Sequence, residues 1–453
     1  MSQLIASDNR VAVIGLGKSG VSAARFLTAK GIPFDVFDSR EKVAGLDEFC
    51  RKYPQIKVSC GALDAEQMAS YKQLVVSPGV SLAVPALAYA EEQGAELLGD
   101  ISLFSQYVTA PFVAITGSNA KSTVTTLVAE MALHDGKRVA VGGNLGMPAL
   151  DLLLDHPDAE LFVIELSSFQ LERTEVLGAD VATILNVSED HLDRYSGMLA
   201  YQQSKQRVYR RSSAAVFNRA DVLTQPLVSQ NMKVVSFGLS KPDLNDYGLL
   251  DVAGTEYLAK GLTPLIASEE LKLPGRHNIE NALSALALGE LVGLNTEAML
   301  ATLKTFSGLR HRCQWLAEIN SVAYFNDSKG TNVGASIAAI NGLSGGEGQV
   351  ILIAGGVAKG ADFSELAELI ADKVKALVAI GEAAATLAKL VDGRIPCVFA
   401  SSMAEAVAEA SAAAAPGDTV LLSPACASFD MFDSFEHRGE LFEHAVFSLT
   451  EVK

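Results

Sequence analysis

The residues best suited to chemistry lie in a short loop that follows an apolar, strand-like run. The run 112–116 is followed by the letters GSNAKST, and a helical pattern begins near Val124. Backbone N–H groups of such a loop, with the N-terminus of the next helix, bind phosphate oxygens, while lysine adds a charge and serine can ligate Mg²⁺. We therefore predict a nucleotide site at Gly117, Ser118, Asn119, Ala120, Lys121, Ser122 and Thr123. The alternative is a helix N-cap beside a surface lysine, which would need only one of these residues.

This loop departs from the common P-loop pattern in two ways. It is shorter, and Ala120 stands where a glycine usually precedes the lysine. If that position requires a positive φ, an alanine there costs roughly 1 kcal/mol or more.

Further candidate residues follow the next strand-like runs of the same region. The run 161–165 ends in Glu165, and a carboxylate at the carboxyl end of a parallel strand can hold the Mg²⁺ that bridges nucleotide phosphates. The run 182–187 leads into a loop of acids that contains His191, a possible metal ligand. Each has a plainer alternative, because Glu165 could cap a turn, His191 could be solvated, and Lys205 could be an exposed helical lysine.

A second glycine loop lies near the N-terminus. Val11–Ile14 reads as a strand, Gly15, Gly17 and Gly20 follow it, and Asp38 ends the strand-like run 34–38. This pattern is the dinucleotide fingerprint and by itself suggests an NAD-dependent dehydrogenase. That interpretation leaves the loop at 117–123 unexplained, whereas one pyrophosphate-bearing substrate together with ATP would use both loops.

The elements that must position these residues belong to three α/β regions. Each region begins with, or soon reaches, an apolar run that ends in a loop of glycines or small residues and precedes a helical pattern, as in βαβ units. The third contains the runs 350–356 and 419–424 and a helix-forming, alanine-rich stretch at 404–415. We predict a Rossmann-like domain at 1–98, a P-loop NTPase-like domain with a mostly parallel sheet at 99–308, and a Rossmann-like domain at 309–453.

Composition excludes several other classes of protein. A chain of 453 residues exceeds a single core, and its net charge of −17, without runs of Lys or Arg, argues against binding nucleic acid. Five scattered cysteines suit reduced thiols. No apolar run is long enough to span a bilayer, and no export signal is visible, so we expect a cytoplasmic protein. A monomer is a separate expectation that these observations do not carry.

Taken together, the motifs of this chain resemble the Mur ligase family over nearly its whole length. They are GLG at 15–17, SPG at 77–79, ITGSNAKST at 115–123, GNLG at 143–146, ELSSFQL at 165–171, HNIEN at 277–281, HR at 311–312, NDSK at 326–329 and SPACAS at 423–428. Members that join D-glutamate to UDP-N-acetylmuramoyl-L-alanine, with ATP, in peptidoglycan precursor synthesis fit best. Family members for other amino acids, and folylpolyglutamate synthetase-like enzymes, are the nearest alternatives. A dehydrogenase or a non-catalytic nucleotide-binding regulator is less well supported.

The resemblance implies a role for each matched position. The UDP substrate would contact Gly17, Lys18, Ser19, Asp38, Ser39, Arg40, Ser77, Pro78, Gly79, Asn144 and His191. ATP would bind residues 117–123 together with Asn278, Asn281, Arg312 and Asp327. Catalysis would use Lys121, Glu165, His191 and Lys205, and two Mg²⁺ ions would be held by Ser122, Glu165, His191 and Lys205, the last as a carbamate. D-glutamate would contact Thr331, Lys359, Ser428 and Phe435.

Three positions depart from the family pattern. They are Ala120, Gly330 after the aspartate, serine and lysine of 327–329, and Val357-Ala358 before Lys359, where Asp-Gly is common. The last lies beside the implied D-glutamate site, so it bears on which amino acid is used.

Overall fold

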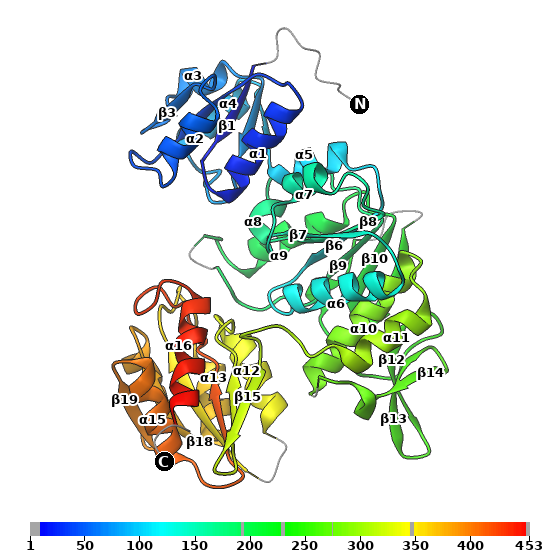
Figure 1. Ribbon diagram of the computed structural model, residues 1–453, viewed down its shortest axis with the longest axis vertical. Helices are drawn as coiled ribbons and strands as arrows, with labels where there is room; N and C mark the ends of the chain where they lie inside the picture. Colours follow the sequence, from blue (N-terminus) through cyan, green and yellow to red (C-terminus); the bar gives the residue numbers. More distant parts are fainter. Residues whose placement is uncertain (1–9, 192–193, 228–231, 274, 345–347, 450–453) are drawn as a thin grey trace.

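Three β-sheets follow one another along the chain, and each forms a separate layered body in the computed structural model (Figure 1). The structure describes residues 10–191, 194–227, 232–273, 275–344 and 348–449. The bodies are arranged with the first at one end and the other two side by side below it, in the orientation of Figure 1. The predicted α/β class with three mostly parallel sheets is confirmed.

The first sheet is parallel and has the order β3-β2-β1-β4-β5. Its strands are β1 (Val11–Ile14), β2 (Phe34–Asp38), β3 (Val58–Cys60), β4 (Gln73–Val76) and β5 (Glu96–Leu98), with helices α1 (Lys18–Ala29), α2 (Leu46–Lys52), α3 (Ala65–Ala69) and α4 (Pro85–Glu92). Because β1 lies between β2 and β4, the order reverses there, and a crevice opens at the carboxyl ends of β1 and β4. The glycine loop and the loop at 77–79 both start at this crevice.

The second sheet has nine strands in the order β14-β13-β12-β11-β10-β9-β6-β8-β7. The parallel strands are β6 (Phe112–Thr116), β7 (Val139–Gly143), β8 (Leu161–Glu165), β9 (Val181–Ile184), β10 (Ala214–Asn218) and β11 (Lys233–Phe237). An edge of antiparallel hairpins follows, formed by β12 (Tyr247–Val252), β13 (Thr255–Lys260) and β14 (Thr263–Ala267). Strand β6 has β9 on one side and β8 on the other, so the loops after these three parallel strands meet at one edge.

The helices of this second part surround that edge and both faces of the sheet. They are α5 (Asp100–Tyr107), α6 (Lys121–His134), α7 (Ala149–Asp155), α8 (Ser168–Leu171), α9 (Met198–Gln206), α10 (Arg276–Leu291) and α11 (Thr296–Thr305), with 3₁₀ turns η1 (Arg207–Tyr209), η2 (Val222–Thr224) and η3 (Ser268–Glu270). Helix α6 begins at Lys121, three residues before the predicted start. The predicted strand 182–187 ends at Ile184, because the backbone of residues 185–186 turns to bond the loop after β6.

The third sheet has the order β15-β16-β20-β17-β18-β19, with β15 antiparallel to the rest. Its strands are β15 (Gln314–Ile319), β16 (Val322–Asn326), β17 (Val350–Gly355), β18 (Val374–Ile380), β19 (Cys397–Ala400) and β20 (Thr419–Leu422), and its helices are α12 (Val333–Leu343), α13 (Ser364–Lys373), α14 (Ala384–Val391), α15 (Met403–Ala413) and α16 (Phe435–Ser448). Ser402 caps the predicted alanine-rich helix through the backbone N–H of Glu405.

Successive residues of these strands enter cores on opposite faces of each sheet. In β1, Val11 and Val13 belong to one core and Ala12 and Ile14 to another. Strands buried on both faces read as continuous apolar runs, which is why the sequence runs at β1, β6 and β17 show no polar alternation. Within the described part of the chain, no helix is both long and apolar enough to span a membrane.

Candidate active site

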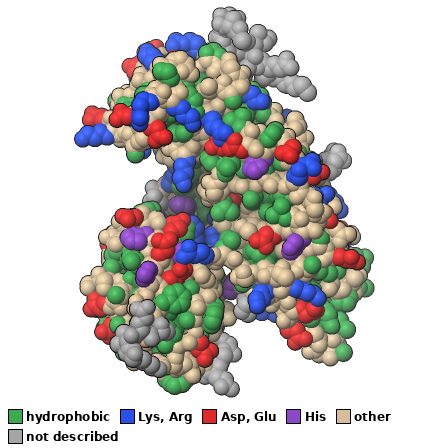
Figure 2. Space-filling view, in the orientation of Figure 1, with side chains coloured by type: hydrophobic (Ala, Val, Ile, Leu, Met, Phe, Trp, Pro, Cys, Tyr) green, Lys and Arg blue, Asp and Glu red, His purple; other side chains and the backbone are tan. Residues whose placement is uncertain are grey.

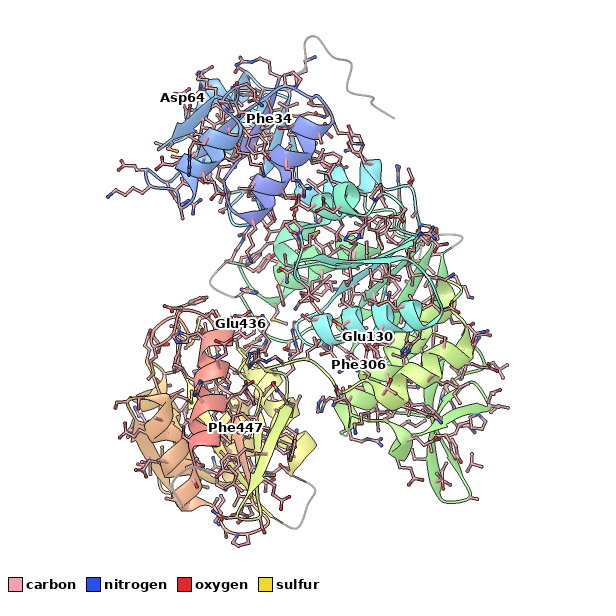
Figure 3. All side chains as sticks on the ribbon, in the orientation of Figure 1. Phe34, Asp64, Glu130, Phe306, Glu436 and Phe447 are labelled. Atoms are coloured by element: carbon pink, nitrogen blue, oxygen red, sulfur yellow. The ribbon has the colours of Figure 1, made fainter. Side chains whose placement is uncertain are left out.

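One large cleft, with a volume of about 1200 Å³, is lined by loops from all three sheets. Figure 2 shows Lys, Arg and His side chains within the recess between the three parts. From the first sheet it takes the glycine loop and residues 77–81, from the second the loops after β6, β7, β8 and β9, and from the third residues 309–312, Lys329 and the start of α16. Glu436, labelled in Figure 3, lies at this last wall. Parallel sheets bind ligands beyond their carboxyl ends, and this cleft collects three such edges.

The wall formed by the first sheet is rigid around Asp38. Its carboxylate is 2% exposed and accepts bonds from the Leu16 backbone N–H at 2.8 Å and from Arg40 Nε and Nη2 at 2.8 and 2.7 Å. The Arg40 bonds lower the pKa of Asp38 to about 2. Both oxygens are thus engaged, so Asp38 fixes Arg40 and the glycine loop instead of offering a free acceptor to a ribose hydroxyl.

The glycine loop itself needs its glycines. Gly15 has φ 92°, and the Ser77 hydroxyl donates to its carbonyl at 2.7 Å. A Cβ at Gly20 would lie 1.8 Å from that carbonyl oxygen, which excludes any side chain. All the positions predicted for the UDP substrate line the cleft, namely Gly17, Lys18, Ser19, Asp38, Ser39, Arg40, Ser77, Pro78, Gly79, Asn144 and His191.

The loop after β6 is folded around its own lysine. Lys121 Nζ donates to the carbonyls of Gly117 and Ser118 at 2.8 and 2.9 Å, and burial lowers its pKa. The Asn119 backbone N–H bonds Asn186 Oδ1 at 2.7 Å, which ties the loop to the one after β9. Ala120 has φ 64°, so the position requires the left-handed conformation, and an alanine there is strained. The arrangement exceeds what a simple helix cap would need.

Glu165, at the end of β8, lines the same cleft with a buried carboxylate. The residue is 2% exposed, and Oε1 accepts a bond from Asn144 Nδ2 at 2.7 Å. Its Oε2 has no hydrogen-bond partner within the described residues. Ser122 Oγ accepts from Arg312 Nη2 at 2.7 Å, and both Ser122 and Glu165 line the cleft. A buried carboxylate oxygen without a donor, in a cleft that a serine hydroxyl also lines, fits a hard divalent cation.

Protein side chains alone would not complete such a metal site. Over the described ranges, no group of three or more His, Cys, Asp or Glu residues is placed to enclose a metal. Mg²⁺ commonly takes one or two protein ligands and completes its shell with water and phosphate oxygens, so the donors here suit a cation that arrives with a nucleotide.

Lys205 is buried behind the loop at 117–123, which we call the phosphate loop. It lies on α9, is 1% exposed, and its Nζ donates to the Gly117 carbonyl at 2.8 Å and lies 4.5 Å from the centre of the Tyr201 ring. Burial, followed by repulsion from Lys121, holds its pKa well below 10.5. The alternative of an exposed helical lysine is therefore wrong.

The third sheet supplies a cation that pairs with the loop after β9. Lys359 Nζ lies 3.2 Å from Asp190 Oδ1, and Asn332 Nδ2 is 3.4 Å from Asp190 Oδ2. Desolvation opposes ionisation of Asp190, but the positive charges of Lys359, His191 and Lys121 together outweigh it and lower the pKa of this carboxyl. His191, with φ 56°, follows in the same loop and its Nε2 is 3.7 Å from Asp190 Oδ2.

The four positions predicted for D-glutamate do not lie in one pocket. Thr331 and Lys359 line a small cavity of about 10 Å³ together with Asp190 and His191. Phe435 lines the large cleft, where Lys329 Nζ lies 3.7 Å from its ring centre. Ser428 is buried and lines neither cavity.

A third cavity, of about 320 Å³, adjoins the phosphate loop. It is lined by Asn119, Ala120, Thr123, Asn278, Asn281, Arg312 and Asp327, all of them predicted ATP contacts, among other residues. Burial raises the pKa of Asp327 to about 6, although Ser423 Oγ donates to it at 2.7 Å. The phosphate loop thus opens toward the large cleft on one side and toward this cavity on the other.

Sequence reasoning did not single out three residues that the structure places at the site. Tyr201 lines the cleft four residues before Lys205, on the same face of α9, a spacing that could have indicated it. Lys329 lies in the motif at 326–329, and burial lowers its pKa to about 8. Asp190 was passed over within the acidic loop, where nothing local marks it as the partner of Lys359.

Comparisons with known proteins agree over nearly the whole chain. The MurD-like N-terminal domain of Mur ligases matches residues 9–99, the Mur ligase middle domain 115–289, and the glutamate ligase domain of Mur ligases 311–426. The "UDP-N-acetylmuramoylalanine--D-glutamate ligase" of Pseudomonas fluorescens strain Pf-5 is 54% identical over 98% of this chain and 99% of its own length. The protein of the same name from Pseudomonas aeruginosa is also 54% identical, with the same coverage.

Solved structures share the fold at much lower identity. The UDP-N-acetylmuramate-alanine ligase of Thermotoga maritima superposes with a TM-score of 0.60 at 18% identity, covering 98% of this chain and 100% of its own. The MurF ligase of the same organism, solved with ADP, gives 0.62 at 15% identity, covering 98% and 96%.

Proposed function

Because the chain belongs to the Mur ligase family, we propose that it is an ATP-dependent ligase that joins D-glutamate to UDP-N-acetylmuramoyl-L-alanine in peptidoglycan precursor synthesis. The observation that carries the proposal is the single cleft into which three sheets each bring one kind of binding group. A glycine loop with Arg40 suits a pyrophosphate, and the loop at 117–123 suits ATP. The third sheet brings the cations Arg312 and Lys329 to the cleft, and its Lys359, in the small cavity beside Asp190, suits a carboxylate. The reaction would take place in the cytoplasm, on a monomer.

The first chemical step is phosphoryl transfer. An oxygen of the alanyl carboxylate attacks the γ-phosphorus of ATP, the bond to the bridging oxygen breaks, and ADP leaves with that electron pair. Lys121 lies at the phosphate loop and Arg312 reaches it from the third sheet, so two cations offset charge on the transferred group. Arg312 would make that contact only while the third sheet is docked.

The second step forms the amide. The amine nitrogen of D-glutamate attacks the carbonyl carbon of the acyl phosphate, a tetrahedral intermediate collapses, and inorganic phosphate leaves with the oxygen that came from the carboxylate. Lys359 would hold one carboxylate of the incoming amino acid once that carboxylate replaces Asp190 as its partner. Closure of the third body would bring Lys359, Ser428 and Phe435 together toward the phosphate loop of the second body and exclude water.

Glu165, Ser122 and His191 are the residues that would hold magnesium. When bound, the cation would offset negative charge on the phosphate oxygens. Glu165 Oε2 supports this assignment, since it is buried without a donor among the described residues. Asn144 holds the other oxygen of Glu165 and thereby orients the carboxylate.

Lys205 would act as a carbamate and not as an amine. Burial depresses its pKa, so a neutral amine is available to attack carbon dioxide, forming a nitrogen–carbon bond and releasing one proton. The product is an anion at the end of a buried chain, close to the phosphate loop, where it could ligate a second magnesium. Activity should therefore fall in buffers stripped of carbon dioxide and return when bicarbonate is added. A rate that does not respond to bicarbonate would contradict the carbamate.

The amino-acid specificity rests on a segment that departs from the family pattern. Val357 forms an antiparallel bridge with Ala427, with backbone N–O distances of 2.9 and 3.0 Å, so the segment before Lys359 is fixed by its backbone. Backbone fixation tolerates a change of side chain, which supports D-glutamate despite the departure. A Mur-type ligase for another amino acid is the alternative that this segment keeps open.

Phosphate release tests the proposal. ATP, Mg²⁺ and UDP-N-acetylmuramoyl-L-alanine are mixed with D-glutamate, with L-glutamate, with other amino acids, or with none. We expect steady release with D-glutamate alone. Release with a different amino acid would reassign the substrate to the alternative ligase, and no release with any of them would favour a nucleotide-binding regulator.

A further inference from the structure

A second groove lies on the face of α9 that points away from the active-site cleft. Its volume is about 990 Å³, and its walls come from α9, from η1 and the residues after it, and from the segment 222–227. Tyr201 and Lys205 line the active-site cleft, whereas Gln203, Ser204 and Arg207 line this groove. The helix α9 therefore separates two cavities. Nothing in the proposed ligase reaction uses the second one.

Three arginines give the groove its charge. Arg207, Arg210 and Arg211 all line it, and the acid among its described lining residues is Glu172. Glu172 is already engaged, because its Oε2 lies 2.8 Å from Arg194 Nη2. Arg207 is half-buried and Arg211 exposed, and among the described residues neither guanidinium has a side-chain hydrogen bond or an ion pair. Arg210 donates only a long bond, 3.4 Å, to the carbonyl of Glu175.

The positive charge of this groove contrasts with the net charge of the chain. The whole chain carries −17, yet the groove brings three cations together, one of them half-buried. A partly desolvated guanidinium beside like charges is unfavourable unless an anion pairs with it and offsets its charge. Guanidinium groups match phosphate oxygens in pairs, which makes a phosphoryl group the best complement to such a cluster.

Apolar side chains lie at the other wall of the groove. Val222 is 76% exposed and Leu227 is 86% exposed, and both line it. Their segment is anchored to α9, because the side-chain amides of Gln202 and Gln206 donate to the Leu223 carbonyl at 3.1 Å each. The groove thus offers cations on one side and exposed aliphatic surface on the other.

We propose that this groove is a second ligand site, which takes a small organic phosphate whose phosphoryl group binds Arg207, Arg210 and Arg211 and whose apolar part packs on Val222 and Leu227. The acidic remainder of the chain repels extended polyanions and anionic membranes, so it favours a small ligand over either. The proposal is independent of the ligase reaction, because no residue of the groove has been placed in that chemistry.

A ligand in the groove would change the order of the phosphate loop through α9, which carries residues of both sites. Arg207 follows Lys205 by two residues, and Lys205 Nζ holds the Gly117 carbonyl of the phosphate loop. A ligand that draws Arg207 and Arg210 together would order the end of α9 and η1. The site is therefore suited to sensing a phosphorylated metabolite and passing the signal to the phosphate loop.

Binding is tested with octyl phosphate, kept below its micelle concentration, and with inorganic pyrophosphate, by calorimetry on the full chain with ADP present to occupy the phosphate loop. The groove variant is Arg207→Gln/Arg210→Gln. The control, Arg138→Gln/Arg394→Gln, removes the same charge from exposed ion pairs elsewhere. We expect the groove variant, but not the control, to bind octyl phosphate at least tenfold more weakly. Wild type should bind octyl phosphate more tightly than pyrophosphate.

Hydrogen exchange gives a second readout on the same proteins. Octyl phosphate should slow exchange of amides in 198–211 in wild type and in the control, and not in the groove variant. Arg211→Gln, an exposed substitution, should weaken binding alone if the double variant proves unstable. Equal affinities of groove and control variants would overturn the site. Binding only to vesicles of phosphatidylglycerol, with none to octyl phosphate, would overturn the small ligand.

Discussion

Replacing Ala120 by glycine should leave the protein as stable as before or slightly more stable. Ala120 has φ 64°, and the left-handed conformation costs an alanine about 1–2 kcal/mol. Glycine removes that strain, but the freer unfolded chain costs about 0.4–1 kcal/mol. Losing the partly buried methyl group, which packs against the core of the second sheet, costs up to about 0.8 kcal/mol more. The balance is a gain of a few tenths of a kcal/mol.

Two other alanines of the same sheet region serve as matched controls. Ala253 also has a positive φ, 54°, and is exposed, so Ala253→Gly relieves strain without losing burial and should stabilise by about 0.5–1 kcal/mol. Ala301 is exposed inside α11, where glycine should destabilise by about 1 kcal/mol.

Hydrogen exchange of the slowest amides in β6 measures these differences. Protection should fall about fivefold in Ala301→Gly, rise severalfold in Ala253→Gly, and stay level or rise up to about twofold in Ala120→Gly. If Ala120→Gly loses protection as Ala301→Gly does, the strain assigned to the phosphate loop is not real. If Ala253→Gly alone loses it, the magnitude of the left-handed penalty is wrong.

Three further predictions concern charged residues of the site. Lys121→Ala should slow phosphate release by about 100- to 1000-fold without lowering the melting temperature, since its described bonds go only to two carbonyls of its own loop; wild-type turnover would remove Lys121 from the mechanism. Lys359→Met should raise the KM for D-glutamate about 10- to 100-fold, whereas Lys375→Met, which breaks an ion pair with Asp418 away from the cleft, should not change it. For Asp327, burial raises the pKa from 3.8 to about 6 in the folded chain, so ionising this carboxyl lowers the free energy of unfolding. This penalty is absent below pH 3.8 and complete above pH 6. Asp327→Asn should therefore gain stability as pH rises through that window, to roughly 3 kcal/mol at most, and urea midpoints that shift equally at pH 4 and pH 7 would refute this.

Much of the fold and of the nucleotide site could be predicted because the signals are local. Runs buried on both faces, such as Val11–Ile14, identify parallel strands without any tertiary information. A strand, a short loop with lysine and serine, and a helix indicate a phosphate site wherever they occur together. The strain at Ala120 could also be anticipated from the sequence, on the condition that this position has a positive φ, which the structure shows.

The remainder depends on contacts between distant segments. Lys205 could not be recognised as buried from its neighbours, since the Gly117 carbonyl that it binds lies 88 residues away. The pairing of Asp190 with Lys359 joins two sheets over 169 residues, and nothing near either one indicates it. Ser428 matched a motif, yet it is buried and lines neither the cleft nor the small cavity beside Lys359, which depends on packing within the third body that no local pattern encodes.

Isotope transfer tests the central claim most directly, because it follows the oxygen atom that the mechanism moves. UDP-N-acetylmuramoyl-L-alanine labelled with ¹⁸O in both oxygens of the alanyl carboxylate is turned over with ATP, Mg²⁺ and D-glutamate, and the released phosphate is analysed by mass. An acyl phosphate intermediate requires that each phosphate carry one ¹⁸O. Phosphate without the label, released while amide is formed, would show that the carboxylate never attacked ATP and would contradict the mechanism.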